Sequence, residues 1–361
     1  MATPPHIAIV GAGLIGLSSA DELLRRGARI TLIESRETPM QGASHANSGM
    51  IHPSQACAWA GDANDPGIDK AVHALAVRSR DRLAIRVVEL GLTAMARRAP
   101  GCFQLFESQA DADSAAERLS GRCIPVETVP SGRLPFDRPA LFYPDDRSGD
   151  AHAYGQALLA SVLDRGATLL AGQKAALSLT HSGVPVLDVG GLRIDADQIV
   201  LAAGSRTPGL LKAMGLTVPI TPVRGWAVDY LRPEALVFPS APVMDALTRS
   251  ALTVFGDTVR LSGTWGTADA DGMVKRWSAL WPELMETLGP ERRRWSGLRP
   301  VSETGQPMIG ETRVRTLWIN AGHGHMGWTL CAGSAEVLAD AMAGKAGAAA
   351  FSPTNAEKNG V

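Results

Sequence analysis

The residues best suited to chemistry lie towards the C-terminus. Arg299 stands between Leu298 and Pro300, and further along Gly322-His323-Gly324-His325-Met326-Gly327-Trp328-Thr329 opens an apolar stretch that predicts a helix over residues 328–342. An arginine guanidinium binds a carboxylate through two parallel hydrogen bonds, and N–H groups at the start of a helix stabilise negative charge. Both features therefore suit an anionic ligand, and the competing interpretation of Arg299 is a surface arginine in a salt bridge.

A glycine-rich turn near the N-terminus predicts a dinucleotide site. The apolar run 6–10 is followed by Gly11-Ala12-Gly13-Leu14-Ile15-Gly16, an amphipathic stretch over 14–26, Gly27, a second strand over 29–33 and Glu34. Gly11 permits a tight turn, Gly13 lets the backbone approach a pyrophosphate, and Gly16 lets the helix pack closely. The carboxylate of Glu34 can accept hydrogen bonds from ribose hydroxyls. The motif does not separate NAD from FAD, and its competing interpretation is a turn without a ligand.

Two kinds of stretch alternate along the chain. Strand–helix alternation, typical of a parallel sheet, occurs at 6–34, 150–204 and 317–344. Between them, strands at 223–230, 251–255 and 258–262, with a hairpin turn predicted at Gly256-Asp257, favour an antiparallel sheet. The predicted fold class is α/β, with a Rossmann-type nucleotide-binding domain interleaved with a mainly antiparallel β-sheet domain.

The composition excludes several classes of protein. With about 150 residues per domain, the 361 residues predict two domains. Lys and Arg total 35 against 36 Asp and Glu, a net charge of −1 that argues against a nucleic-acid partner. No apolar run is long enough to span a bilayer, and the N-terminal residues do not resemble a secretion signal. The four widely spaced cysteines, Cys57, Cys102, Cys123 and Cys331, predict free thiols, no metal site and a cytoplasmic location.

Three stretches carry a family resemblance. They are the small, polar run Gly42–Pro53 around Ala46-Asn47-Ser48-Gly49, the expected loop Trp295-Ser-Gly-Leu-Arg299-Pro300, and the Gly322–Thr329 turn. In this order they resemble the glycine oxidase/D-amino acid oxidase family of FAD enzymes, most closely its bacterial D-amino acid dehydrogenase branch. The resemblance covers residues 6–344 and implies an interleaved fold. We expect an FAD-binding domain from 1–85, 146–218 and 296–345, a substrate-binding domain from 86–145 and 219–295, and a tail over 346–361.

The resemblance also implies which residues hold FAD. We expect the flavin to bind without a covalent link, although His45 lies one position from where some relatives attach theirs. The segments near residue 175 and at residues 203–204 are expected to lie next to the dinucleotide. The expected cofactor-binding residues are Gly11, Gly13, Leu14, Ile15, Gly16, Glu34, Ser35, Ser44, His45, Ala46, Asn47, Gly49, Met50, Ile51, Ala175, Ala203, Gly204, Gly324, His325, Met326, Gly327, Trp328 and Thr329.

For the substrate, the resemblance assigns the carboxylate to Arg299. Relatives often place a tyrosine close to position 249, where this chain has Arg249, which either replaces it as a second carboxylate-binding group or points to solvent. His325 lies either against the flavin ring or carboxylate, or in the turn with backbone contacts alone. Arg299, His325 and Arg249 are thus the expected catalytic residues, and Trp226 and Trp265 wall the pocket or belong to the core.

The activity implied is FAD-dependent oxidative deamination of an amino acid, in which hydride passes from the substrate Cα to flavin N5 and leaves an imino acid. The leading interpretation is a D-amino acid dehydrogenase, with D-proline and hydroxyproline among its substrates. One alternative is a glycine or sarcosine oxidase that makes hydrogen peroxide, and another is the flavin-bearing subunit of a hetero-oligomeric dehydrogenase. The sequence does not decide whether the electron acceptor is a quinone, a dye or oxygen. It also does not decide whether the protein contacts the inner face of the membrane peripherally.

Overall fold

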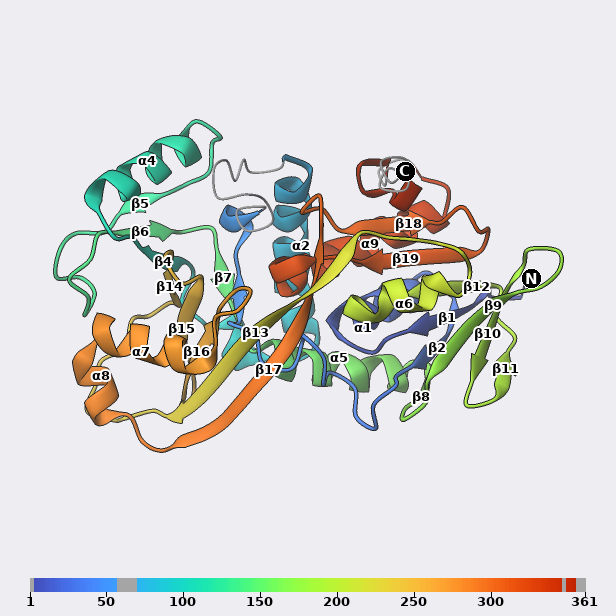
Figure 1. The fold of residues 1–361 in the computed structure, drawn as a ribbon, viewed down its shortest axis with the longest axis horizontal. Coiled ribbons are helices and arrows are strands. Elements are labelled where there is room, and N and C mark those ends of the chain that lie inside the picture. Colours follow the sequence, from blue (N-terminus) through green and yellow to red (C-terminus); the bar gives the residue numbers. More distant parts are fainter. Residues whose placement is uncertain (1–2, 57–69, 346–348, 355–361) are drawn as a thin grey trace.

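The described residues, 3–56, 70–345 and 349–354 of the computed structural model, fold into two lobes that each contain a large sheet (Figure 1). In the first lobe, six strands form a sheet whose pairs are all parallel except β18–β19. Its spatial order is β18 (Met308–Glu311), β19 (Leu317–Ala321), β12 (Gln198–Leu201), β1 (His6–Val10), β2 (Arg29–Ile33) and β8 (Thr168–Leu170). The expected parallel sheet is confirmed.

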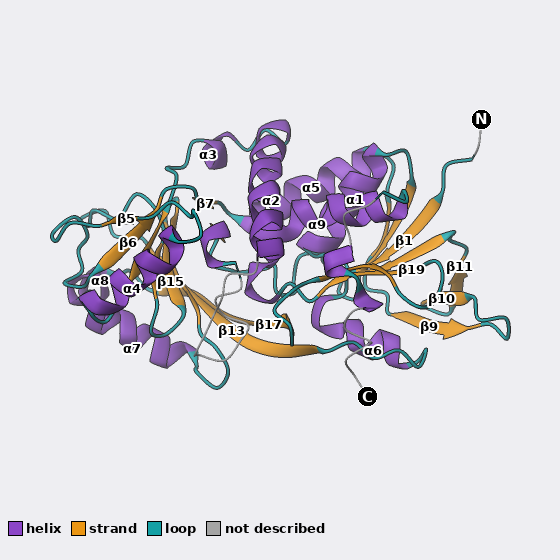
Figure 2. Ribbon diagram, turned by 90° about the horizontal axis from the view of Figure 1, so that it is seen from above, coloured by secondary structure: helices purple, strands orange, loops and turns teal. Residues whose placement is uncertain are grey.

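The first sheet is covered on both faces, because successive residues of a strand point to opposite sides. Ile7 and Ile9 of β1 join a core with helices, whereas Ala8 and Val10 join a core on the other face. The helices are α1 (Leu14–Arg25), α2 (Lys70–Glu89), α5 (Ala151–Asp164) and α9 (Gly327–Met342) (Figure 2). The other face packs against β9 (Ala175–Leu179), β10 (Pro185–Val189), β11 (Leu192–Ile194) and α6 (Thr207–Lys212).

The second lobe contains an eight-stranded sheet in which only the β14–β4 pair is parallel. Its order is β17 (Glu291–Ser302), β13 (Ile220–Leu231), β16 (Thr258–Gly263), β15 (Ser250–Phe255), β14 (Val243–Asp245), β4 (Cys102–Leu105), β6 (Ala140–Tyr143) and β5 (Glu127–Thr128). Phe255 pairs with Thr258, and Gly256 has φ +57, so the predicted hairpin turn is confirmed. The expected fold class is confirmed as well.

One face of this second sheet packs on helices and the other faces the first lobe. Trp277 of α7 (Ala270–Leu280) is fully buried in a core cluster with Leu252 and Leu261 of the sheet. On the opposite face, Thr253 Oγ1 donates to Ser48 O of the first lobe at 2.7 Å. The remaining elements are β3 (Met50–Ile51), β7 (Arg147–Ser148), α3 (Thr93–Ala96), α4 (Gln109–Ser120), α7 (Ala270–Leu280), α8 (Pro282–Thr287), and the 3₁₀ helices Pro53–Gln55, Gly204–Arg206, Gly324–Met326 and Ala349–Phe351. Within the described ranges, no helix has the length and apolar character needed to cross a bilayer.

Strands β13 and β17 run side by side from one lobe to the other (Figure 1). The expected loop around Arg299 is therefore wrong, because residues 295–300 lie inside β17. Proline is tolerated there since β17 is an edge strand, and Pro300 faces Pro222 beyond the part of β13 that pairs with β16. The chain thus crosses between the lobes within a strand, and this makes Arg299 part of a rigid element.

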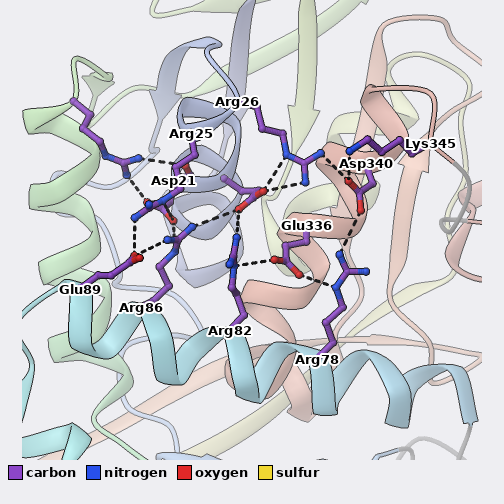
Figure 3. A network of polar contacts seen from close by, with 12 residues as sticks. Asp21, Arg25, Arg26, Arg78, Arg82, Arg86, Glu89, Glu336, Asp340 and Lys345 are labelled. Carbon is purple, nitrogen blue, oxygen red and sulfur yellow. Dashed lines mark hydrogen bonds and ion pairs between the residues drawn. The ribbon is translucent and has the colours of Figure 1, made fainter.

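A network of charged side chains joins α1, α2, α5 and α9 (Figure 3). Arg86 of α2, only 4% exposed, places Nε 2.8 Å from Asp21 Oδ2 of α1 and Nη1 2.6 Å from Glu89. Glu336 of α9 binds Arg78 at 2.7 Å and Arg82 at 2.8 Å. The other members are Glu22, Arg25, Arg26, Arg165, Asp340 and Lys345. Because buried charges need partners, the network restricts how α2 can sit on its neighbours.

The described part of the C-terminal segment packs on the first lobe. Phe351 is buried in the helical core. Gly310 of β18 has φ +151, and a Cβ there would lie 3.1 Å from Pro353 Cδ. Residues 349–354 therefore pack beside β18, the edge strand of the first sheet.

Candidate active site

The turn between β1 and α1 forms a cradle that accepts only glycine. Gly11 has φ +111, and a Cβ on it would lie 2.5 Å from Ala202 O and 3.1 Å from Ala203 Cα. A Cβ on Gly16 would overlap Gly11 O. Gly13 caps α1 without a side-chain hydrogen bond. The start of α1 therefore presents main-chain N–H groups beside a turn shaped for close approach, which suits a phosphate.

Further predicted cofactor residues meet at this turn. Glu34 Oε2 accepts a hydrogen bond from Ala12 N at 3.1 Å, so its carboxylate lies against the glycine turn. Ser35 Oγ accepts from Arg206, close after Gly204, at 2.7 Å. Gln173 N donates to Glu34 O at 3.0 Å, and Ala175 follows it at the start of β9. The structure thus brings together the residues expected at one end of a dinucleotide.

Residues 44–52 connect the glycine turn to the start of α9. Ser44 Oγ accepts from Leu14 N at 3.1 Å. At the other end, Trp328 Nε1 donates to Gly49 O at 3.3 Å, and His52 N donates to Thr329 Oγ1 at 3.1 Å. An extended ligand along this segment therefore has the N-terminus of α1 at one end and that of α9 at the other.

A cavity lies where this segment meets β13, β15, β16 and β17. Its wall consists of Ala43, Ala46, Asn47, Ser48, Met50, His52, Gly225, Trp226, Arg249, Ser250, Ala251, Ser262, Gly263, Trp295, Gly297, Arg299 and His325. All three expected catalytic residues lie in this wall, and so does Trp226. Trp265 instead packs with the small core cluster around Met50 and Ala251. Of the expected cofactor residues, Ala46, Asn47 and Met50 also line this wall, whereas their neighbours Gly49 and Ile51 do not.

Arg299 is held by main-chain carbonyls rather than by an acid. Its Nη1 donates to Thr264 O at 2.9 Å and to Arg224 O at 3.4 Å, and its Nη2 donates to Gly263 O at 3.0 Å. The guanidinium lies over Gly225, where a Cβ would be 2.5 Å from Nη2. Burial lowers the pKa of Arg299 to about 10, so the group stays cationic at neutral pH. The described wall of the cavity contains no Asp or Glu.

The histidines of the cavity are neutral at physiological pH. Burial lowers the pKa of His52 to about 4. Burial, then the positive charge of a protonated His52 and of Arg299, lowers the pKa of His325. The two rings lie 5.8 Å apart. His323 lies outside the wall, and burial lowers its pKa to about 3. The two arginines therefore carry the formal charge of the described wall.

His45 lies beside the cavity in a cluster of arginines. Arg293 Nη1 donates to His45 Nε2 at 3.1 Å, which leaves the ring proton on Nδ1. Burial, and then the charge of Arg293, lowers the pKa of His45 to about 4. Asp229 binds Arg293 and also Arg260, the latter at 2.7 and 3.0 Å. Because Arg260 donates to Asn47 O at 3.1 Å, this cluster fixes residues 45–47 against the second sheet.

Sequence reasoning missed several residues of the wall, among them Ser48, His52, Ser262 and Trp295. It also missed the strand glycines Gly225, Gly263 and Gly297, where an added Cβ would meet Arg299, Ser250 and Trp295 respectively. A glycine inside a strand indicates a close approach, so these three carried a usable signal. Ser48 and His52 lie inside the Gly42–Pro53 run that carried the family resemblance, whereas Ser262 carried no signal.

The described residues form neither a cluster of metal-binding side chains nor a disulfide. No group of three His, Cys, Asp or Glu side chains there is arranged to hold a metal ion. Cys102, Cys123 and Cys331 are free thiols. Cys57 lies outside the described residues.

A parallel sheet with a glycine cradle, joined to a second sheet that walls a cationic cavity, defines a two-lobed dinucleotide-binding protein. The sequence profile of the FAD dependent oxidoreductase family matches residues 6–341, and the chain belongs to this family. The dinucleotide is therefore FAD.

Curated relatives share sequence with this chain, and solved structures share its fold. The chain is 30% identical to a D-amino acid dehydrogenase of Methylobacterium radiotolerans, over 94% of this chain and 96% of that one. It is 31% identical to a D-amino acid dehydrogenase of Cereibacter sphaeroides, over 94% and 92%. Glycine oxidase from Geobacillus kaustophilus shares the fold with a TM-score of 0.83 at 24% identity, covering 96% and 98% of the chains. L-proline dehydrogenase from P. horikoshii also shares it, with a TM-score of 0.83 at 17% identity and full coverage of both chains.

The residues present fit FAD. The glycine turn at Gly11 and Gly16 leaves room for a pyrophosphate to approach the backbone closely. The Glu34 carboxylate lies beside this turn, where it can accept hydrogen bonds from a ribose. The Nδ1 atoms of His45 and His52 are buried, and neither has a partner within the described residues. Buried polar atoms are normally hydrogen-bonded, so these two atoms indicate that a polar ligand lies along residues 44–52.

Proposed function

We propose that this protein is an FAD-dependent dehydrogenase that oxidises a D-amino acid to its imino acid. The observation that carries the proposal is Arg299, a cation in the cavity wall whose partners are main-chain carbonyls. A partly buried cation without an acid needs an anionic ligand, and the fork of arginine matches a carboxylate. The names of the relatives supply the substrate class and the reaction.

In this proposal the first lobe binds FAD and the second lobe binds the substrate. Bound FAD supplies the acceptor for the hydride that leaves the substrate Cα. Arg299 binds the substrate carboxylate, and its carbonyl partners fix the direction of the guanidinium. Positive charge from Arg299 and Arg249 disfavours the substrate ammonium, so the amine loses its proton more readily. A neutral amine is the form from which hydride can leave.

The start of α9 serves the cofactor rather than the substrate. Residues 324–329 enter α9 through a 3₁₀ turn, and Met326 caps the helix without a side-chain hydrogen bond. Main-chain N–H groups at this end stabilise negative charge on a bound cofactor. We assign Gly324 to Thr329 this role, and we assign the electron acceptor to a quinone or dye. Three free thiols favour a cytoplasmic location.

The test is anaerobic reduction of the purified, FAD-loaded protein by a panel of D- and L-amino acids, glycine, sarcosine and hydroxyproline isomers. We expect a D-amino acid to bleach the flavin band, and little reoxidation on admitting air. Arg299→Met should lower kcat/KM at least about 10²-fold, because a charged partner of the carboxylate is lost. Arg292→Met removes an exposed arginine of the same strand and should change nothing. Bleaching by no amino acid would refute the function, and full turnover by Arg299→Met would refute the role of that residue.

A further inference from the structure

A second cavity lies in the second lobe, where β15 extends beyond its neighbour β14. Pairing between these two strands stops at Val243 and Leu252, whereas β15 continues to pair with β16 as far as Phe255. Within the described residues, one edge of β15 therefore has no strand partner over residues 253–255. The cavity beside this edge has a volume of about 300 Å³. Small-molecule sites begin at roughly this size.

The wall of the second cavity combines two cations with an apolar surface. It consists of Arg98, Ala99, Arg232, Phe238, Pro239, Ser240, Ala241, Leu252, Val254 and Gly256. This described wall contains no Asp or Glu, and it shares no residue with the described wall around Arg299. The second cavity is therefore positively charged and separate from the active-site cavity.

The alternation of side chains along β15 also separates the two cavities. Leu252 and Val254 belong to the core that packs on α7. Their neighbours point the other way, because successive residues of a strand face opposite sides of the sheet. Ala251 lines the active-site cavity, and Thr253 donates to Ser48 O of the first lobe. The apolar part of the second cavity wall thus faces away from the first lobe.

Arg98 is held beside the open edge of β15 by neutral groups. Its Nε donates to Ser148 Oγ at 2.9 Å, and its Nη1 donates to Val254 O at 2.9 Å. The guanidinium lies over the ring of Phe255, with the central carbon 5.4 Å from the ring centroid. Burial lowers the pKa of Arg98, and the charge of Asp150 opposes this shift without forming an ion pair. Arg98 is therefore a largely buried cation whose described partners are uncharged.

Arg232 reaches the same cavity from the loop that follows β13. Its guanidinium lies over the ring of Phe238, with the central carbon 5.3 Å from the ring centroid. Its Nη1 donates to Gly256 O at the long distance of 3.5 Å. The carbonyls that Arg98 and Arg232 approach belong to residues two positions apart, Val254 and Gly256, whose Cα atoms lie within about 7 Å of each other. Two like charges thus meet one short stretch of chain, and an anion between them removes their repulsion.

We propose that the second cavity binds a small organic anion, with its charged group between Arg98 and Arg232 and its apolar part against Phe238 and Val254. A carboxylate and a phosphate ester share this chemistry, because the fork of arginine donates two parallel hydrogen bonds to either group. The apolar wall favours an anion with a hydrocarbon or aromatic part over a bare ion. This ligand is neither the substrate nor FAD, so the site goes beyond the proposed function.

The first experiment measures binding to the FAD-loaded protein by calorimetry. The probes are phenyl phosphate, 3-phenylpropionate, inorganic phosphate, propionate and the neutral benzyl alcohol. All titrations use the Arg299→Met variant, because Arg299 itself offers a site for carboxylates. We expect at least one phenyl-bearing anion to bind about tenfold or more tightly than its bare counterpart, since burial of an aromatic ring is favourable. Benzyl alcohol should not bind, and the better of the two phenyl-bearing anions identifies the charged group.

The second experiment assigns the binding to the two arginines. Added to Arg299→Met, both Arg98→Gln and Arg232→Gln should weaken the tighter probe at least about tenfold, because each removes a charged hydrogen-bond donor. Arg98→Lys should retain part of the affinity, since it keeps the charge without the fork. Arg292→Gln removes an exposed arginine of β17 and is the matched control, which should keep the affinity.

Two features keep the test decisive. Arg98 also holds Ser148 and Val254, so melting temperature and FAD content report whether each variant is folded, and the exposed Arg232 provides a variant that leaves those contacts in place. The titrations need no turnover, so their result does not depend on whether an amino acid reduces the flavin. A failure of the proposed function and a failure of this site are therefore distinguishable.

Three results would overturn the proposal. The first is that none of the four anions binds. The second is that the tighter probe binds Arg98→Gln and Arg232→Gln as well as it binds the Arg292→Gln control, since the anion would then lie elsewhere. The third is that benzyl alcohol binds as tightly as the anions, because the two cations would then contribute nothing.

Discussion

Replacing Gly225 by alanine tests whether the position of Arg299 controls substrate binding. Gly225 lies in β13 directly beneath the guanidinium, and a Cβ there would be 2.5 Å from Nη2. Non-bonded heavy atoms need about 3.5 Å, so the guanidinium has to move by about 1 Å. The substitution removes no charged group, and it changes only the position of the Arg299 guanidinium.

The magnitude follows from the hydrogen bonds that this movement breaks. Arg299 donates to Thr264 O at 2.9 Å and to Gly263 O at 3.0 Å, and a shift of about 1 Å takes both beyond hydrogen-bond range. Each bond from a charged donor contributes about 1.5–3 kcal/mol, and misplacing a binding group by about 1 Å costs roughly 10²-fold in rate. We therefore expect Gly225→Ala to lower kcat/KM about 10²-fold, equal to about 2.7 kcal/mol.

The assay is anaerobic stopped-flow reduction of the flavin over a range of substrate concentrations, with FAD content measured on the same samples. We expect FAD binding to be unchanged, since Gly225 lies away from the glycine cradle. Gly209→Ala is the control, because Gly209 is exposed and nothing lies within 4 Å of an added Cβ. A folded, FAD-loaded Gly225→Ala protein with wild-type kcat/KM would refute the argument that the Arg299 position sets the affinity.

Three further perturbations test the cofactor cradle, a buried acid and the helix network. Gly16→Ala puts a Cβ into Gly11 O, so FAD affinity should fall at least about tenfold in a fluorescence titration, and unchanged affinity would contradict the cradle. Burial raises the pKa of Asp146 from 3.8 to about 7. Between these pH values the folded protein keeps a proton that the unfolded chain has lost, so the free energy of unfolding falls as the pH rises and levels off above about 7. Asp146→Asn should remove this loss and gain up to about 4 kcal/mol at pH 8 but little at pH 4 in urea unfolding, whereas an equal gain at both would contradict the assignment. Arg86→Met removes one buried partner of Asp21, which keeps Arg25 and Arg165, and should lower the free energy of unfolding by about 1.5–3 kcal/mol. The exposed control Arg292→Met should cost less than about 1 kcal/mol, and equal losses would show that the network adds nothing.

Much of the first lobe could be predicted because its signals are local. Gly11, Gly16 and Glu34 lie within one strand–turn–helix–strand unit, and the requirement for glycine arises from atoms of that unit and the adjoining strand. The hairpin at Gly256-Asp257 is local in the same way. The resemblance added FAD, which the family match confirms, whereas the glycine motif alone did not separate FAD from NAD.

The second lobe was predicted less well, because its elements depend on distant partners. Residues 295–300 were expected as a loop because the family resemblance implied one there. They form part of β17 because β13, far away in sequence, supplies a long pairing partner. No local pattern contains that partner, so only the folded chain shows that Arg299 stands on a strand.

By itself the sequence determined the class of the fold, the cradle for a dinucleotide and the arginine most suited to a carboxylate, because each depends on residue types at short spacing. Only the tertiary structure decided that Arg249 enters the cavity, that Asp229 ties Arg260 and Arg293 to residues 45–47, and that the described cavity wall contains no acid. The physical reason is that charge balance and side-chain direction in a cavity are properties of groups brought together from distant parts of the chain. Arg249 is an example, because its direction depends on the turn in which Asp245 accepts from Thr248 N, on the ring of Trp265 and on the approach of Gly263.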